Sequence, residues 1–372
     1  MRVGVPKEIK DHEDRVGLVP SSVNELVHHG HEVLIERDAG LGAGLTDDQY
    51  LAAGARIAAD AAEVFSSSEL IVKVKEPLAS ERKRLHRGQV LFTYLHLAPD
   101  PEQTLDLLGS GVTAIAYETV TSPTGGLPLL TPMSEIAGRL APQVGARYLE
   151  RTSGGRGVLL GGVPGVPPAE VVVLGGGVSG THAATIALGM GATVFVVDRS
   201  GDALRRLAAQ MPGIRTIFST RDALGTILRR ADLLIGAVLV PGAAAPKLVS
   251  RAMVAAMKPN SVIVDIAIDQ GGCCETSRPT SHSHPTYVEE GVTHYCVTNM
   301  PGAVARTSTF ALNNATLPFV LALADKGWRK AIDDDPHLRN GLNVHAGKLT
   351  CRPVAEALGM PYTPPETVAA LS

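Results

Sequence analysis

The chain has 372 residues, of which 45% are hydrophobic and 19% are charged, and its formal net charge is -3. This length predicts two domains, and the composition excludes a disordered chain. A nucleic-acid-binding protein would carry a clear basic excess, which this chain lacks. The one dense basic run, from Arg82 to Arg87, is expected to form a solvated helix face.

The four cysteines show no C-x-x-C spacing, so they predict thiols rather than a zinc site. The pair His282 and His284 has no third ligand nearby and is expected in a solvent-exposed loop, so no metal is predicted. No apolar run is long enough for a membrane span, and the chain begins with a predicted strand rather than a signal peptide. These features favour the cytoplasm, where cysteines stay reduced.

The first third of the chain alternates short strands with helices. Strands are expected at Val3–Val5, Glu32–Ile35, Leu70–Val74, Val90–Tyr94 and Thr113–Ala116, and helices at Pro20–His29 and Ala59–Phe65. This alternation predicts a mostly parallel sheet with helical cover.

A predicted helix, Met133–Leu149, leads to the glycine- and proline-rich segment Thr152–Pro168, which we expect to be a linker. A second βα series follows. Its strands are expected at Val171–Leu174, Thr193–Val197, Leu233–Ala237, Ser261–Ile266 and near His294–Val297.

The C-terminal segment returns to a helical pattern at Leu312–Ala324, and the rest is expected to be helical without strands of its own. Such a tail would pack back on the first domain. The predicted fold is therefore α/β, with two doubly wound Rossmann-like domains and mostly parallel sheets. The first domain would be discontinuous (1–130 plus 305–372), and the dinucleotide-binding domain would span 131–304.

The sharpest motif is Gly175-Gly-Gly-Val178-Ser-Gly180, a G-x-G-x-x-G pattern directly after a predicted strand and at the start of a helix. Gly175 permits the tight turn, Gly177 lets the backbone approach a pyrophosphate, and Gly180 allows close helix–strand packing. The N–H groups of the helix start then face the phosphates.

Asp198 ends the next predicted strand, where a carboxylate can accept hydrogen bonds from ribose hydroxyls. Because it would repel a 2′-phosphate, it favours NAD over NADP. Arg199 follows directly and could accommodate a phosphate, which weakens this preference. The alternative is a structural glycine turn with a surface aspartate.

Four side chains are candidates for chemistry on an amino acid: Arg15, Lys75, His96 and Asp269. Arginine matches a carboxylate bidentately. Lys75 and His96 end predicted strands, where α/β folds place ligands, and histidine suits proton transfer. Asp269 lies in a glycine-rich stretch past a strand. Each also has a structural alternative: a surface arginine, a solvated lysine or a structural histidine.

Several segments together resemble the alanine dehydrogenase / pyridine nucleotide transhydrogenase family, in its alanine dehydrogenase branch, over essentially the whole chain. They are Met1–Lys10, Val72–Pro77, Leu91–Leu97, Val171–Gly180, Gly236–Gly242, Val264–Gly272 and Asn299–Pro301.

The resemblance implies roles for individual residues. Arg15 and Lys75 would bind the substrate carboxylate, His96 would be the acid/base, and Asp269 would act on water and the carbinolamine. Glu118 and Met133 would line the substrate site. The expected NAD contacts, beside the glycine loop with Val178 and the ribose acid Asp198, are Ser134, Ser219, Leu239, Ile266 and Asn299.

The implied activity is NAD-dependent interconversion of L-alanine with pyruvate and ammonia. Hydride leaves Cα, and the resulting imine is hydrolysed with help from His96 and Asp269. The family also implies a homo-hexamer.

Three alternatives remain open. An NAD(H)-binding transhydrogenase component looks similar across both domains but would not need His96 and Asp269. A lysine-forming saccharopine dehydrogenase shares the style of Val72–Pro77, although the Asp265–Gly272 segment favours the alanine type. A non-catalytic NAD-responsive protein would bind NAD without turnover.

Overall fold

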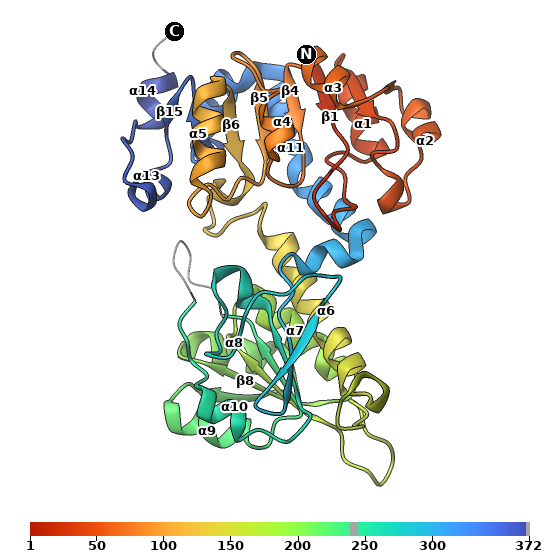
Figure 1. Cartoon of the computed structure of the whole chain (residues 1–372), viewed down its shortest axis with the longest axis vertical. Coiled ribbons are helices and arrows are strands. Elements are labelled where there is room, and N and C mark those ends of the chain that lie inside the picture. The colour runs from red at the N-terminus through yellow and green to blue at the C-terminus, as the bar shows by residue number, and fades with distance from the viewer. Residues whose placement is uncertain (239–244, 370–372) are drawn as a thin grey trace. The chain divides into compact units, whose positions relative to one another are not determined.

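The computed structural model describes residues 1–238 and 245–369, and these form two compact units. The first unit comprises residues 1–133 together with those from 304 onward, and the second comprises residues 134–303. In Figure 1 the first unit carries both the red N-terminal and the blue C-terminal elements. The boundaries between the two units fall at 133/134 and 303/304, whereas the sequence predicted domain boundaries at 130/131 and 304/305.

Within the described residues, the sheet of the first unit has eight strands in the order β15-β14-β6-β5-β4-β1-β2-β3. The six from the N-terminal part pair in parallel, whereas β14 runs antiparallel to β6 and β15 antiparallel to β14. The strands are β1 (Arg2–Val5), β2 (Glu32–Glu36), β3 (Arg56–Ala58), β4 (Leu70–Val72), β5 (Val90–Thr93), β6 (Thr113–Ala116), β14 (Leu342–His345) and β15 (Lys348–Leu349).

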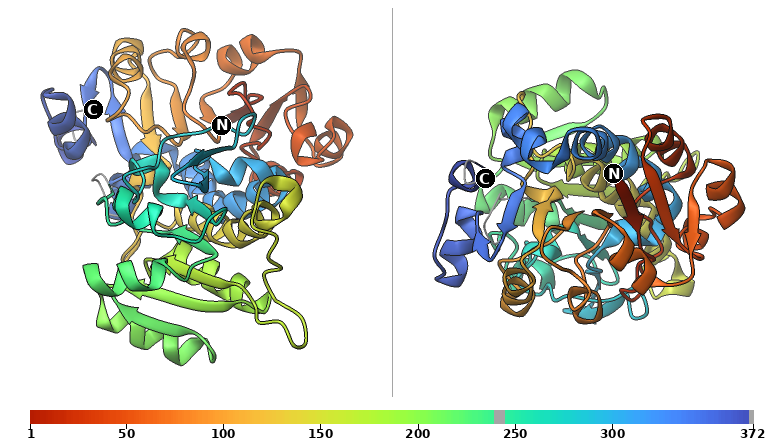
Figure 2. Two further views of the ribbon diagram at one scale, coloured as in Figure 1. Left: turned by 60° about the horizontal axis from the view of Figure 1, so that its bottom comes forward. Right: turned by 90° about the horizontal axis from the view of Figure 1, so that it is seen from above.

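The expectation that the C-terminal tail has no strands is wrong. β14 and β15 form a hairpin on the edge of the sheet, beside β6, as Figure 1 and both views of Figure 2 show. The two residues between them, Ala346 and Gly347, both have positive φ, 46° and 81°, which is the geometry of a tight hairpin turn. An Ala-Gly pair is not the usual signal for such a turn, so the sequence pattern concealed it.

Helices cover this sheet. They are α1 (Pro20–His28), α2 (Asp47–Ala52), α3 (Ala61–Ser67), α4 (Ala79–Arg82), α5 (Pro101–Ser110), α11 (Ala305–Asp334), α12 (Pro336–Arg339), α13 (Arg352–Leu358) and α14 (Pro365–Ala369), with 3-10 turns η1 (Leu41–Ala43) and η2 (Tyr117–Thr119). The 3-10 turn η5 (Met300–Val304) lies at the boundary between the units. α11 is longer than predicted and is interrupted at Gly327, where φ is 73°.

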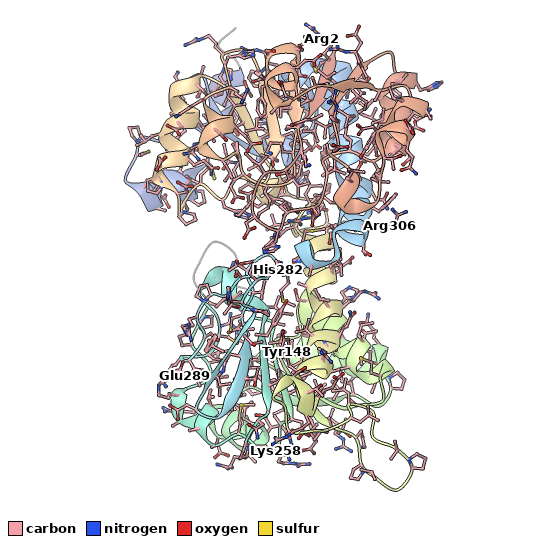
Figure 3. All side chains as sticks on the ribbon, turned by 45° about the vertical axis from the view of Figure 1, so that its right-hand side comes forward. Arg2, Tyr148, Lys258, His282, Glu289 and Arg306 are labelled. Atoms are coloured by element: carbon pink, nitrogen blue, oxygen red, sulfur yellow. The ribbon has the colours of Figure 1, made fainter. Side chains whose placement is uncertain are left out.

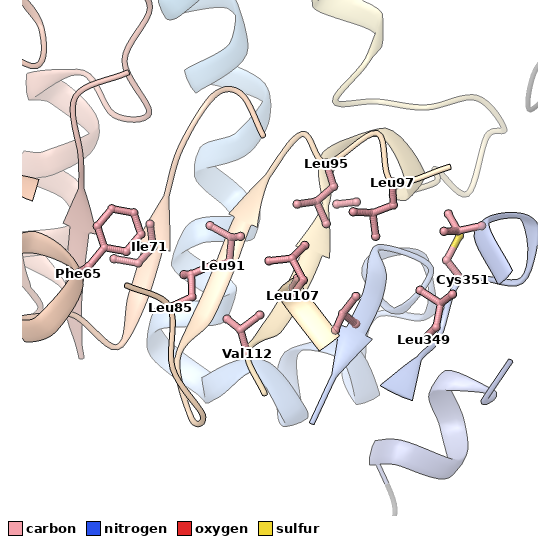
Figure 4. Close-up of a cluster of buried hydrophobic side chains, with 14 of the residues drawn as sticks. Phe65, Ile71, Leu85, Leu91, Leu95, Leu97, Leu107, Val112, Leu349 and Cys351 are labelled. Carbon is pink, nitrogen blue, oxygen red and sulfur yellow. The ribbon is translucent and has the colours of Figure 1, made fainter. Parts of the chain in front are cut away.

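One apolar core of the first unit joins the sheet to α3 and α5. Phe65, Ile71, Leu91 and Leu107 are buried in it, and Leu349 of the tail hairpin joins the same cluster (Figure 4). The tail therefore belongs to the same core as the N-terminal strands.

The basic run is solvated as expected at Lys83, Arg84, His86 and Arg87, but it is not a helix face, because α4 already ends at Arg82. The Arg82 side chain is buried and pairs with Glu102 and Asp106 of α5. This arginine links two helices rather than facing a polyanion.

Within the described residues, the second unit has a seven-stranded sheet in the order β12-β13-β11-β10-β7-β8-β9, parallel except for the β12–β13 pair. Its strands are β7 (Glu170–Leu174), β8 (Thr193–Asp198), β9 (Arg215–Phe218), β10 (Leu233–Gly236), β11 (Val262–Asp265), β12 (Thr286–Glu289) and β13 (Val292–Tyr295). Its helices and turns are α6 (Thr131–Leu149), which starts at the unit boundary, η3 (Arg151–Ser153), α7 (Val178–Gly189), α8 (Gly201–Gln210), α9 (Arg221–Leu228), α10 (Arg251–Ala255) and η4 (Ile266–Gln270).

Two mostly parallel sheets with helical cover confirm the α/β prediction. The segment 152–168 lies inside the second unit rather than between units: Val163 and Val166 bridge each other, and Leu160 is buried. All four cysteines are free thiols, as expected. Among the described residues, none of the helices combines the length and the apolar character that a membrane span requires.

Candidate active site

Three of the predicted residues in the first unit follow neighbouring parallel strands. Lys75 lies beyond β4, His96 beyond β5, and Glu118 in η2 beyond β6. β4 and β5 end earlier than expected, so Lys75 and His96 lie in loops. Hydrogen bonds connect these loops: the Thr93 hydroxyl donates to the Lys75 carbonyl, and Glu118 accepts backbone N–H groups from the His96 loop. The fold therefore brings all three residues to the same end of the sheet, where the parallel strands have their carboxyl ends.

Arg15 is buried, with 2% of its side chain exposed, and it forms a bidentate pair with Glu13. Nε and Nη2 donate to the two Glu13 oxygens over 2.6 and 2.5 Å, and Nη1 lies 3.1 Å from the Met133 sulfur. Burial lowers the pKa of the guanidinium, but Glu13 outweighs this effect and keeps that pKa above its ordinary value. Arg15 is thus a permanently charged group in a fixed plane, suited to orienting a carboxylate.

The loop that carries Arg15 is held by α11, from the other end of the chain. The Asn313 side chain accepts from Val19 N at 3.0 Å and donates to the Gly17 carbonyl at 2.7 Å. Thr309 accepts from Val16 N at 3.3 Å. Sequence analysis missed this support. Its signal was a set of polar residues, Ser308, Thr309, Asn313 and Thr316, that the helix buries among apolar ones.

Lys75 is partly buried, and its Nζ lies 3.7 Å from the Glu76 carboxylate. Glu76 also pairs with Lys10. Burial alone would raise the pKa of Glu76, but Lys75 and Lys10 lower it below its ordinary value, so this carboxylate stays ionised. Lys75 and Lys10 thus place two basic side chains around one ionised carboxylate, and basic side chains suit an anionic substrate.

A second lysine, Lys73, is fully buried between Glu8 and Glu81, with Nζ at 3.1 and 2.6 Å from their oxygens. Burial lowers the pKa of Lys73, but the two carboxylates outweigh it and hold that pKa above its ordinary value. Glu8 also accepts from the N–H groups of Val74 and Lys75. The buried network thus fixes the backbone that presents Lys75.

The His96 side chain is 44% exposed and stacks on Tyr94, with 5.8 Å between ring centroids and 5° between ring planes. Its neighbours Leu95 and Leu97 are buried. An imidazole held on an exposed turn, here 4.0 Å from the Glu118 carboxylate, can exchange protons with a ligand or with water.

The glycine loop of the second unit has the geometry of a dinucleotide site. Gly175 has φ 103°, and a Cβ there would lie 2.7 Å from the Ala237 carbonyl. A Cβ on Gly180 would lie 1.8 Å from the Gly175 carbonyl, whereas one on Gly177 would meet nothing within 4 Å. The open space at Gly177, beside an α7 start that no side chain caps, fits a pyrophosphate.

Asp198 ends β8 and holds this loop. Its Oδ2 accepts from Gly176 N at 2.6 Å and its Oδ1 from Ser200 N at 2.7 Å. Each oxygen retains lone-pair capacity for a ribose hydroxyl. Arg206, which sequence analysis missed, donates to the Gly176 carbonyl over 2.7 Å, and Ser219 donates its N–H to the Asp198 carbonyl.

Ile266 and Asp269 lie on η4, after β11, and the Asp269 side chain is exposed. Asp265 holds this turn: its oxygens accept from Ala267 N, Cys273 N and the Ser277 hydroxyl.

Asn299 has φ 63°, and its carbonyl accepts from His282 Nε2 at 3.1 Å; His282 is labelled in Figure 3. His282 is thus half-buried and bonded rather than solvent-exposed as expected, whereas His284 is exposed. Of the other predicted NAD contacts, Val178 begins α7 and Ser134 lies in the first turn of α6. Leu239 lies outside the described residues.

Among the described residues, one cluster has metal-ligand types: Asp265, Cys273 and Cys274, all buried. The hydrogen bond with Cys274, together with burial, raises the pKa of the Cys273 thiol well above its ordinary value. Since Asp265 already accepts several hydrogen bonds and the thiol stays protonated, the cluster is suited to holding the loop rather than a cation.

Two family models match consecutive parts of the chain. They are "Alanine dehydrogenase/PNT, N-terminal domain" over residues 4–137 and "Alanine dehydrogenase/PNT, C-terminal domain" over residues 141–352. The chain is also similar to the alanine dehydrogenase of Halomonas elongata, with 62% identity over 363 residues, which is 97% of this chain and 98% of that protein.

Two solved structures have the same architecture. An L-alanine dehydrogenase matches with a TM-score of 0.94 and 54% identity, covering 96% of this chain and 99% of that chain. A transhydrogenase from Sinorhizobium meliloti matches with a TM-score of 0.81 and 26% identity, covering 95% and 99%. The similarity is thus greater to the dehydrogenase than to the transhydrogenase. These matches cover nearly the whole chain, and they show that it belongs to the alanine dehydrogenase/PNT family.

Proposed function

We propose that this chain is an NAD-dependent L-alanine dehydrogenase, which converts L-alanine to pyruvate and ammonia and catalyses the reverse reductive amination. The observation that carries this proposal is that a chain similar to alanine dehydrogenases over its full length also contains two groups of suitable side chains. One group has cations and an imidazole at strand ends, and the other surrounds a dinucleotide-type glycine loop.

The first unit would bind the amino acid. Arg15, aligned by Glu13, and Lys75 would bind the carboxylate of alanine, because a planar fork and a point charge together fix its orientation. Met133, in contact with Arg15, would line the pocket at this end, and Glu118 would border it next to His96.

The second unit would bind NAD. The loop of Gly175, Gly177, Val178 and Gly180 would hold the pyrophosphate, and Asp198 the adenosine ribose. The other contacts would come from Ser134, Ser219, Leu239, Ile266 and Asn299. When bound, NAD supplies the hydride acceptor for the reaction.

His96 and Asp269 would manage the protons. His96 would accept a proton from the substrate amine or water and return it to the departing ammonia. Asp269 would orient the water that attacks the carbon of the substrate imine, and the carbinolamine would then lose ammonia to leave pyruvate.

We also propose a homo-hexamer and a cytoplasmic location. The family resemblance supports the assembly, and four free cysteines suit a reducing compartment. Light scattering on the purified protein tests the assembly: a mass of six chains supports it, and any other mass contradicts it.

The decisive experiment follows the NADH absorbance band with purified protein, NAD and a panel of L-amino acids at alkaline pH. NADH formation with L-alanine, and little with D-alanine or with NADP, supports the proposal. NADH binding without turnover on any amino acid would instead indicate a transhydrogenase component or a non-catalytic NAD binder. Turnover on saccharopine but not on alanine would indicate the lysine-forming type.

A further inference from the structure

We propose that Glu118 is a positioning residue for His96: its carboxylate fixes a left-handed backbone turn and thereby directs the imidazole. This inference rests on the proposed function, in which His96 transfers protons. It gives Glu118 a role different from that of a residue that binds the substrate.

The hydrogen bonds of Glu118 go to the backbone of the His96 loop. Its Oε1 accepts from His96 N at 2.6 Å, and Leu95 N lies 3.2 Å from both carboxylate oxygens. The His96 Nδ1 is 4.0 Å from Oε1. Charge-assisted bonds of this kind are roughly twice as strong as neutral ones.

The turn needs such support because His96 has φ 50°, in the left-handed region that glycine favours. A non-glycine residue there costs about 1–2 kcal/mol. The flanking side chains Leu95 and Leu97 are anchored in the core (Figure 4), and Gln103 donates to the Leu95 carbonyl over 2.6 Å. The left-handed residue thus turns the imidazole outward while both neighbours remain buried.

Glu118 reaches this turn from the adjacent strand. It follows β6, whose last residue Ala116 pairs with Thr93 at the end of β5. The carboxylate therefore connects two strand ends. A negative charge would also repel the carboxylate of an amino acid, which argues against direct binding of that group.

The first test is Glu118→Gln, which keeps the side-chain size but replaces one acceptor oxygen with an NH₂ group that faces backbone donors. We expect kcat for L-alanine to fall by about 10- to 100-fold, because small misplacements of a catalytic group are costly. KM for alanine and the NADH dissociation constant should change less than about threefold. Glu63→Gln is the matched control, because Glu63 also accepts a backbone N–H, from Ala59, but lies away from this loop.

A double-mutant cycle with His96→Ala tests whether Glu118 acts through His96. Once His96 is truncated, adding Glu118→Gln should reduce kcat no further, so the two effects should not multiply. Multiplying effects, or a KM that rises while kcat is kept, would overturn the inference in favour of direct substrate binding.

A double-mutant cycle on melting temperature tests whether Glu118 stabilises the left-handed turn, even if the Glu118→Gln variant has too little activity to measure. Glycine tolerates the left-handed conformation, so Glu118→Gln should lower the melting temperature less in a His96→Gly background than in the wild type. Equal losses in both backgrounds would contradict the turn-holding role. A His96→Ala variant with wild-type kcat would refute the proposed role of His96 itself. Loss of turnover in His96→Ala with normal kcat in Glu118→Gln would refute only the positioning role.

Discussion

Four carboxylates, two in each unit, accept hydrogen bonds from backbone N–H groups of the loops that carry candidate site residues. Glu8 holds the loop of Lys75, Glu118 that of His96, Asp198 the glycine loop, and Asp265 the turn that carries Asp269. Each loop follows a strand end, where backbone donors no longer pair with a neighbouring strand. The carboxylates satisfy these donors and so give the loops one conformation.

Asp198→Ala should weaken NAD binding and relax the discrimination against NADP. The substitution removes an acceptor for the ribose and the charge that repels a 2′-phosphate, and it leaves the Gly176 and Ser200 N–H groups without this partner. We expect KM for NAD to rise about tenfold or more, from the loss of a charged hydrogen bond of roughly 1.5–3 kcal/mol.

Steady-state kinetics with NAD and with NADP measure this effect. Asp202→Ala is the control, because Asp202 is an exposed acid on the neighbouring helix that pairs only with Arg205 among the described residues. An unchanged preference for NAD in Asp198→Ala would remove Asp198 from the ribose site.

His294 predicts a pH dependence of stability. Burial lowers its pKa, and the ring is held neutral: Nδ1 donates to the Val292 carbonyl at 2.9 Å and Nε2 accepts from Thr276 at 2.8 Å. Below the unfolded-state pKa of about 6.5, the unfolded chain binds a proton that the native chain does not. This contribution is therefore present above that pH and is lost as the pH falls below it.

Thermal melts between pH 8 and 5 test the prediction. The wild type should lose stability toward pH 5, and His294→Gln, which cannot titrate, should be less stable at pH 8 but show a weaker decline. A decline of equal steepness in both proteins would show that other groups cause it.

At the scale of elements, the strand β7 and the helix α7 meet at Gly180. A Cβ there would lie 1.8 Å from the Gly175 carbonyl, so the helix and the strand can approach this closely only with glycine. The restriction arises where α7 packs against the turn that directly follows β7, because the Gly175 carbonyl belongs to that turn and the nearest strand atom, Val173 Cγ1, would lie at 3.4 Å.

Gly180→Ala should therefore separate α7 from β7, with a loss of about 1–3 kcal/mol in the free energy of unfolding and weaker NADH binding. Gly189→Ala in the same helix is the matched control, because a Cβ there would meet nothing within 4 Å. That change should be neutral or stabilising by up to about 1 kcal/mol. Denaturant unfolding and NADH fluorescence titration compare the two, and equal behaviour would contradict the packing argument.

At the scale of the whole molecule, the two ends of the chain build one unit. The tail supplies β14 and β15 to the sheet and α11 to the loop of Arg15. A residue near position 313 thus supports a candidate site residue near position 15.

Asn313→Asp tests this long-range support. The aspartate keeps the acceptor for Val19 N but cannot donate to the Gly17 carbonyl, and it places an unpaired charge in a buried site. We expect a loss of about 1–3 kcal/mol in the free energy of unfolding and a several-fold higher KM for alanine, because the Arg15 loop loosens. Asn314→Asp, at the adjacent exposed position, should leave both quantities unchanged. Similar effects of the two substitutions would contradict the proposed support.

The sequence alone predicted the central strands of both sheets, the glycine motif and the strand-end candidates Lys75, His96 and Asp198. Central strands are buried on both faces, so they appear as apolar, β-branched runs such as Val171–Leu174. Motif glycines likewise depend on local backbone geometry. The catalytic and binding roles of these residues stay predictions until the experiments above are done.

The missed strands β3, β9, β12, β14 and β15 lie at or next to the edges of the sheets. β3, β9 and β12 are partly exposed, so their apolar patterning is weak, whereas β14 is short and includes the polar residues Asn343 and His345. The supporting partners Glu8, Glu13, Asn313 and Arg206 were missed for a related reason. Local propensity and hydrophobic pattern determine which segments become central strands, and the sequence records both. The pairing of β14 with β6 and the buried bonds of Glu8 and Asn313 join residues far apart in the chain, so only the tertiary structure decided them.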